Sequence, residues 1–252
     1  MKKLLVILFI FGTVLNGISQ NSMDSVLAKA ASQYNEGYFH ESIKSYNQVL
    51  ESGFESAEIY YNQGNAYFKI NDLPSAILFY EKAKKLKPND EDILYNLNVA
   101  NSRIVDKIEN VPELFLRTWW NSFYNMFSAN GWAKITIGCF IFFLFLFGVY
   151  LLSSKRVIKK LFFIVAAFIF LSTIFSFALS YQKYYYSTEQ KEAIIFQPTV
   201  TVKSSPNRSS VDLFVIHEGT KVYISDELDS WYEIKIANGS VGWLPKSTAR
   251  LI

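Results

Sequence analysis

The sequence predicts a multidomain membrane protein: an α-helical repeat stack, a two-helix transmembrane hairpin and a C-terminal all-β barrel. Three observations along the 252 residues support this prediction. The first part of the chain aligns with itself at a shift of 34 residues, which is a period typical of helical repeats. The middle contains two long apolar runs without a charge, and the last quarter alternates apolar and polar residues.

The composition agrees with membrane segments, since 50% of the residues are hydrophobic and 17% are aromatic. The net charge of +3 is uneven, because the apolar middle is basic and both flanks are acidic, which does not fit a nucleic-acid-binding face. A single cysteine, Cys139, excludes an intrachain disulfide and a Cys-rich metal site. No nucleotide-binding, zinc-protease or nucleophile-elbow motif occurs. We therefore expect no catalytic residue, no metal, no cofactor and no enzymatic activity.

Residues 1–19 are predicted to be a secretory signal peptide. Lys2 and Lys3 precede a short apolar run, and the small residues Gly17 and Ser19 precede the expected cleavage point. An uncleaved membrane anchor is the alternative interpretation of the same residues.

Residues 20–111 are predicted to form helical repeats at 24–54 and 57–88, followed by a capping helix over 91–110 that Pro112 ends. The middle copy resembles the tetratricopeptide repeat, a helix–turn–helix unit. The residues that carry the resemblance are the small residues Gly64, Ala76 and Ala83, the aromatic residues Tyr67 and Tyr80, and Pro88.

In that repeat family the first helices of successive repeats line a concave surface that binds segments of other proteins. Charged, amide and aromatic side chains recur there at helical spacing. We expect the partner-binding residues to be Tyr34, Glu58, Tyr61, Asn62, Asn65, Phe68, Lys69 and Tyr95. The alternative is that Tyr61 and Phe68 are core residues and the asparagines are surface residues, since aromatic residues at helical spacing usually belong to a core.

The two uncharged runs predict transmembrane helices at 135–152 and 161–181, because about 20 apolar residues cross a bilayer. The connector between them, 153–160, is rich in lysine and arginine, which places it in the cytoplasm and both soluble domains in the periplasm. The preceding segment, 112–134, contains aromatic residues that favour an amphipathic helix at the interface of the bacterial inner membrane.

Residues 187–252 are predicted to form five to seven short strands, with Asn238 and Gly239 in a two-residue hairpin turn. Four features resemble the bacterial SH3-like domain: Val200–Pro206, the turn at Gly219, and the pairs Trp231-Tyr232 and Gly242-Trp243. That resemblance implies a surface for peptides or cell-wall material. The residues expected there are Tyr223, Trp231, Tyr232 and Trp243, and the alternative is that one or more of these aromatic residues pack into the barrel. His217 is expected to be a satisfied surface residue.

The order of the parts, with runs such as residues 100–120 and 200–222, resembles the BatE family of the Bacteroides aerotolerance group. The resemblance covers essentially the whole chain. It implies an envelope scaffold or adaptor that binds proteins, with von Willebrand-A-type membrane proteins as partners, in a complex linked to aerotolerance or stress. The alternative function is sensing or anchoring of peptidoglycan through the SH3-like domain.

Overall fold

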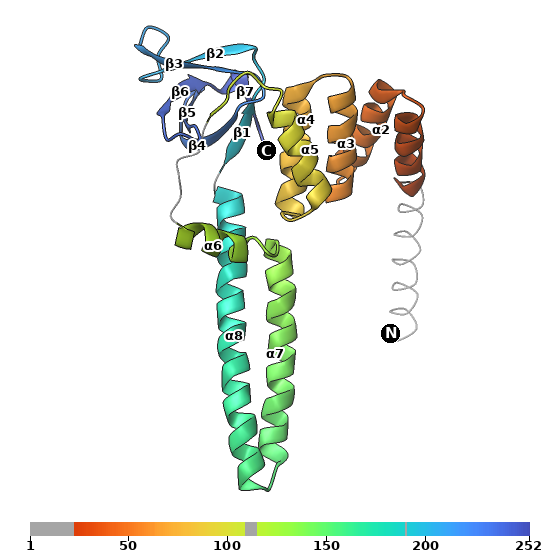
Figure 1. The fold of residues 1–252 in the computed structure, drawn as a ribbon, viewed down its shortest axis with the longest axis vertical. Helices are drawn as coiled ribbons and strands as arrows, with labels where there is room; N and C mark the ends of the chain where they lie inside the picture. The colour runs from red at the N-terminus through yellow and green to blue at the C-terminus, as the bar shows by residue number, and fades with distance from the viewer. Residues whose placement is uncertain (1–22, 109–114, 190) are drawn as a thin grey trace, which may run out of the picture.

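The computed structural model describes residues 23–108, 115–189 and 191–252. A helical stack and a β-sheet lie side by side and form a head, from which a long helical hairpin extends (Figure 1). The predicted signal peptide, residues 1–19, lies outside the described residues, as do residues 112–114 of the predicted interfacial segment.

The stack consists of antiparallel helices joined by short turns. Its members are the helix over residues 23–35, α2 (Phe39–Glu51), α3 (Ala57–Lys69), α4 (Leu73–Leu86) and α5 (Glu91–Asn101). The side chains of Ser56 and Asp72 cap α3 and α4, because each accepts a hydrogen bond from a backbone N–H of the first turn. Gly37 and Asn71 occupy equivalent turns of the two repeats, and both have a positive φ. The same left-handed turn therefore recurs at the repeat period.

The small residues of the middle repeat let α3 and α4 approach closely. A Cβ atom on Gly64 would lie 2.7 Å from the ring of Tyr80. Ala76, Ala83 and Tyr80 are themselves buried. The residues that carry the resemblance to the repeat therefore form the contact between the two helices.

Helix α5 ends at Asn101, so the prediction of one capping helix over 91–110 was wrong. The chain leaves the helix because residues 104–108 pack against the sheet. Ile104 joins the core of the stack beside the sheet, and Ile108 packs on the core of the sheet. The carboxylate of Asp106 accepts hydrogen bonds from two residues of the sheet. These tertiary contacts override the helical pattern of the sequence.

Among the described residues two helices are long and apolar enough to cross a membrane, α7 (Ala129–Leu152) and α8 (Arg156–Glu189), and they form the hairpin. They pack along each other, and α6 (Phe115–Tyr124) lies across their end nearest the head (Figure 1). The Thr136 hydroxyl donates to the Ser176 hydroxyl across the pair at 3.0 Å. The expected connector at 153–160 is shorter in the structure, because α8 begins at Arg156 and includes its last basic residues.

The C-terminal part is a seven-stranded antiparallel sheet in the order β3-β2-β6-β5-β4-β1-β7. The strands are β1 (Glu192–Ile195), β2 (Thr199–Lys203), β3 (Asp212–His217), β4 (Lys221–Leu228), β5 (Trp231–Lys235), β6 (Val241–Pro245) and β7 (Ala249–Leu251). The expected turn joins β5 to β6, with Gly239 at φ +93°. The sheet surrounds one apolar core that six of its strands share.

In β3 the alternating apolar residues Leu213 and Val215 face solvent, together with Val211 just before the strand. Val211, Leu213 and Val215 are 47–70% exposed, whereas Phe214 and Ile216 face the core. The apolar residues that predicted this strand therefore lie on its outer face. Because both sets are apolar, the period of two located the strand without showing which face is buried.

The stack and the sheet share a buried interface. Ile77 of α4 and Ile194 of β1 are fully buried in one cluster. Beside them the Lys221 ammonium lies 3.0 Å from a carboxylate oxygen of Glu81 in α4 and 3.0 Å from one of Glu192 in β1. Burial alone would lower the Lys221 pKa, but the two carboxylates raise it above its ordinary value. The two domains therefore form one unit held by apolar and ionic contacts.

Candidate functional site

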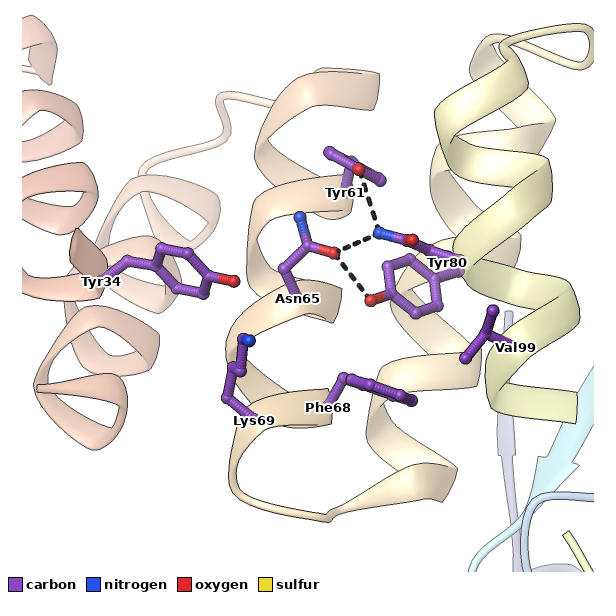
Figure 2. A pocket seen from close by; sticks show the side chains of 8 residues that line it. Tyr34, Tyr61, Asn65, Phe68, Lys69, Tyr80 and Val99 are labelled. Atoms are coloured by element: carbon purple, nitrogen blue, oxygen red, sulfur yellow. Dashed lines mark hydrogen bonds between the residues drawn. The ribbon is translucent and has the colours of Figure 1, made fainter. Parts of the chain in front are cut away.

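A pocket of about 270 Å³ opens on the face formed by the first helices of the repeats. It is lined by Tyr34, Tyr61, Asn65, Phe68, Lys69, Tyr80, Asn96 and Val99. The lining comes from the helix over residues 23–35, from α3, α4 and α5, and combines aromatic rings with amide and hydroxyl groups (Figure 2). We call it the stack pocket.

A hydrogen-bond network fixes the floor of the stack pocket. The Asn65 side-chain oxygen accepts from the Tyr80 hydroxyl at 2.7 Å and from the Asn96 side-chain amide at 2.8 Å. The same Asn96 nitrogen donates to the Tyr61 hydroxyl at 3.0 Å. The side chain of Tyr34 points toward Asn65 from the neighbouring helix (Figure 2). Asn65 thus joins α3 to α4 and α5, and its own amide nitrogen is on the side opposite these bonds.

Burial disfavours the charged form of two tyrosine hydroxyls in the stack pocket, those of Tyr34 and Tyr80. It raises the pKa of Tyr80, and it raises the pKa of Tyr34, to which Tyr61 adds. Lys69 supplies the positive charge of the lining. Outside the lining, the Arg103 guanidinium lies 4.4 Å from the centre of the Phe68 ring. The pocket can therefore offer apolar ring faces, neutral hydrogen-bonding groups and a cationic edge to a bound segment.

The stack pocket brings together five of the eight residues predicted for a repeat groove. Glu58 and Asn62 are outside its lining and lie toward Tyr46 of α2. Burial raises the Tyr46 pKa, and a hydrogen bond from Asn62 partly offsets this rise. Tyr95 is 69% exposed and also outside it. Tyr61 is the equivalent residue one repeat earlier, and α5 packs over it. Within the described residues no further repeat helix follows α5, so nothing covers Tyr95 in the same way.

Sequence reasoning missed Tyr80, Asn96 and Val99 as parts of this pocket. The sequence identifies Tyr80 only as an aromatic position of the repeat, although its hydroxyl reaches the pocket floor. Asn96 is the repeat equivalent of Asn62, so the 34-residue period contained a signal that could have identified it.

The four aromatic residues predicted for a binding face on the sheet do not share one face. Trp243 of β6 pairs with Glu233 of β5, and Glu233 is two residues from Trp231 on the same strand. Trp231 and Trp243 therefore lie on the same face of the sheet, the outer one. Tyr232 lies between these positions and packs against the core, with the Lys246 ammonium 5.1 Å from its ring centre. Tyr223 is exposed and lies nearer the stack.

His217 is bound to the segment that follows the stack. Its backbone N–H donates to an Asp106 carboxylate oxygen at 2.6 Å, and its ring Nδ1 lies 2.8 Å from the other oxygen. The Thr220 hydroxyl donates to the same carboxylate at 2.6 Å. Burial works against the charge of Asp106, but the hydrogen bonds from Thr220 and His217 hold its pKa below the ordinary value. His217 is a satisfied residue, and its partner joins the two domains.

The repeat geometry agrees with a comparison against protein-family models, in which the tetratricopeptide repeat matches residues 57–90. Residues 57–90 are a tetratricopeptide repeat. This match covers α3, α4 and the turn that follows them, and it contains five of the eight residues that line the stack pocket. A comparison with curated proteins found no match. Tetratricopeptide repeats imply protein partners and are typically non-catalytic interaction modules.

Proposed function

We propose that this protein is a membrane-anchored adaptor that binds a segment of a partner protein in the stack pocket. The observation that carries the proposal is the pocket itself, which lies on the face that repeats of this kind use and has a lining of rings, amides and one ammonium group. The two membrane-length helices supply the anchor, and hydrogen bonds from Asn89 to the residues before α7 join the stack to that anchor.

The proposed topology follows from charge. The basic residues near the turn between α7 and α8 favour the cytoplasmic side, which places the stack and the sheet in the periplasm at the inner membrane. The resemblance to the BatE family extends the proposal to an SH3-like identity for the sheet domain and to an aerotolerance or stress-related envelope complex. In that complex the partners would be von Willebrand-A-type membrane proteins.

The test uses the full-length tagged protein extracted in mild detergent. A double variant, Tyr34→Ala with Lys69→Ala, removes one ring and the charge from the stack pocket without breaking the hydrogen bonds of its floor. The matched control, Tyr95→Ala with Lys44→Ala, removes the same groups from exposed positions outside the pocket. Quantitative mass spectrometry then measures the proteins that co-purify with each form.

We expect the same membrane proteins to co-purify with the wild type and the control, and at least tenfold less with the pocket variant, at an equal melting temperature. Equal recovery with both variants would refute binding in the stack pocket. Recovery of von Willebrand-A-type proteins would support the envelope complex, whereas a different set of partners would contradict it.

A second candidate function, attachment to peptidoglycan, is favoured by the shared outward orientation of Trp231 and Trp243. In this case the full-length protein in detergent would sediment with purified wall material. The variant Trp231→Ala would lose the sedimentation, and the stack-pocket variant would keep it. If the wild type does not sediment, this function is excluded.

A further inference from the structure

A second cavity, of about 1000 Å³, lies where the head meets the hairpin. Its wall is formed by the end of α4, the polar side of α6, the first turn of α7, the head-proximal part of α8 and strands β1 and β4. These segments are far apart in the sequence, and Figure 1 shows α6 and the ends of α7 and α8 directly below the head. We call it the junction cavity.

The walls of the junction cavity are tied together by hydrogen bonds. The Asn89 amide at the end of the middle repeat donates to the backbone oxygens of Asn125 and Met126, at 2.8 and 3.1 Å. The Lys183 ammonium of α8 donates to the backbone oxygens of Tyr124 and Phe127, at 3.1 and 2.9 Å, and to the Asn125 side chain at 3.0 Å. The stack and the hairpin are thus joined through the connector between α6 and α7.

The lining carries an excess of positive charge. It contains the lysines Lys84, Lys85, Lys183 and Lys221 against the carboxylates Glu81 and Glu192. Both carboxylates are already paired with Lys221, and Glu192 also with Lys85. Within the described ranges neither Lys84 nor Lys183 has a carboxylate partner. The three donors of Lys183 are used by uncharged oxygens, so Lys183 can act on a group in the cavity through its charge and not through a hydrogen bond.

The first turn of α7 adds a second, independent positive contribution. Ser128, Ala129 and Asn130 all line the cavity, and they begin a helix of 24 residues. The N-terminus of a helix carries a positive partial charge and favours an anion. Lysine side chains and a helix N-terminus therefore face the same hollow, and both favour a negatively charged group of modest size.

The position of α6 shows where such a group would come from. One side of α6 is apolar and exposed, with Phe115 and Trp119 both more than three-quarters exposed. The side opposite Trp119, at Asn121, lines the junction cavity, with Thr118 and Ser122 at its edge. An amphipathic helix at a membrane surface buries its apolar face about 5–10 Å into the boundary between headgroups and acyl chains. Because a helix is about 10 Å across, the opposite side of α6 then lies at the level of the lipid phosphates.

We propose that the junction cavity binds the phosphate-containing headgroup of an anionic phospholipid of the membrane that holds the hairpin. This rests on the membrane anchoring proposed above. The excess charge of Lys84 and Lys183 and the end of α7 hold the phosphate, and the amide side chains around them accept or donate to its polar substituents. A bound headgroup joins the stack, the sheet and the hairpin at one point and sets the height of the stack pocket above the membrane.

The experiment compares lipids of different charge on the full-length protein in delipidated detergent micelles. Phosphatidylglycerol, phosphatidylcholine and inorganic phosphate are added separately, and the melting temperature and the lipid retained in native mass spectra are measured. The variant Lys84→Ala with Asn130→Asp removes one positive charge and places a carboxylate in the first turn of α7. Since an acidic residue there stabilises a helix, this variant should keep its fold. Lys44→Ala with Asn98→Asp makes the same changes at exposed positions elsewhere.

We expect phosphatidylglycerol to be retained by the wild type and the control, to raise their melting temperatures, and to bind at least tenfold more weakly to the cavity variant. Phosphatidylcholine should have no such effect. Equal retention by both variants would assign the lipid to the surface of the hairpin and overturn the proposal. Stabilisation by inorganic phosphate but not by phosphatidylglycerol would overturn the lipid as its source. Membrane insertion is tested separately by alkaline extraction of cell membranes, so its failure is distinguishable from failure of the cavity.

Discussion

The stack pocket and the junction cavity differ in origin and in chemistry. The stack pocket is built by neighbouring repeats, between Tyr34 and Val99, and most of its polar groups are neutral amides and hydroxyls. The junction cavity is built by segments that extend from Glu81 to Ile252, and its lining is rich in charge. The difference shows that neighbouring repeats are enough to form a pocket. The charged cavity instead forms only where the stack, the sheet and the hairpin meet.

The largest effect is expected where the charged network of the interface is broken. Lys221→Ala leaves the carboxylates of Glu81 and Glu192 buried without their main partner. Removal of one partner from a buried ion pair costs about 3–5 kcal/mol of the free energy of unfolding. The melting temperature of the full-length protein in detergent measures it, with the exposed Lys235→Ala as the control. An unchanged melting temperature would show that this network does not hold the two domains together.

The next effect concerns the carboxylate that ties the segment after α5 to the sheet. Asp106→Ala removes the acceptor of the hydrogen bonds from His217 and Thr220 and should lower the free energy of unfolding by about 2–3 kcal/mol, as hydrogen bonds to charged groups do. We expect the melting temperature to fall while the binding of lipid and of partner proteins persists at lower temperature.

The same residue predicts a pH dependence with a defined sign. Because the folded-state pKa of Asp106 is depressed, the unfolded chain binds the proton more readily. The stabilisation is therefore complete above pH about 4, the ordinary range of the carboxyl, and is lost as the pH falls through the lower folded-state value. The difference in melting temperature between the wild type and Asp106→Asn should shrink between pH 7 and pH 3. A difference that grows over this interval would contradict the assigned sign.

A further prediction concerns the close approach of α3 and α4 beside the stack pocket. Gly64→Ala places a methyl group 2.7 Å from the Tyr80 ring, so α3 and α4 must separate. Overpacking of this kind costs about 1–3 kcal/mol of the free energy of unfolding. The control is Gly138→Ala in α7, where nothing lies within 4 Å of the added atom and the melting temperature should stay equal or rise. Equal behaviour of the two variants would refute the close approach.

The smallest effect is expected from the floor of the stack pocket. Asn65→Ala deprives the Tyr80 hydroxyl and the Asn96 amide of their acceptor. The cost should be about 1 kcal/mol, because solvent in the open pocket replaces part of the lost bonding. We therefore expect Asn65→Ala to lose partner binding with only a small fall in the free energy of unfolding. Adding Asn96→Ala should change the melting temperature little further, since both side chains belong to one network. A fully additive second loss would show that the network is not shared.

Local pattern was sufficient for much of the fold and for part of the stack pocket. Helical spacing placed Asn65 and Lys69 on one face beside Tyr61 and Phe68, and the structure places all four in the lining. It could not show that Tyr95 stays exposed, because this depends on whether another helix covers α5. It also could not place the end of α5, since the contacts of Asp106 with the sheet are made by residues more than a hundred positions away.

The sequence by itself determined the repeat, the two apolar helices and the alternation that forms strands, because each of these depends on residues close together in the chain. The tertiary structure decided which face of β3 is buried, how the sheet docks on the stack, and that lysines from three elements surround one cavity. The physical reason is that burial and net charge at a point in space depend on every segment that packs there. Helical and strand periodicity depend only on neighbours in sequence.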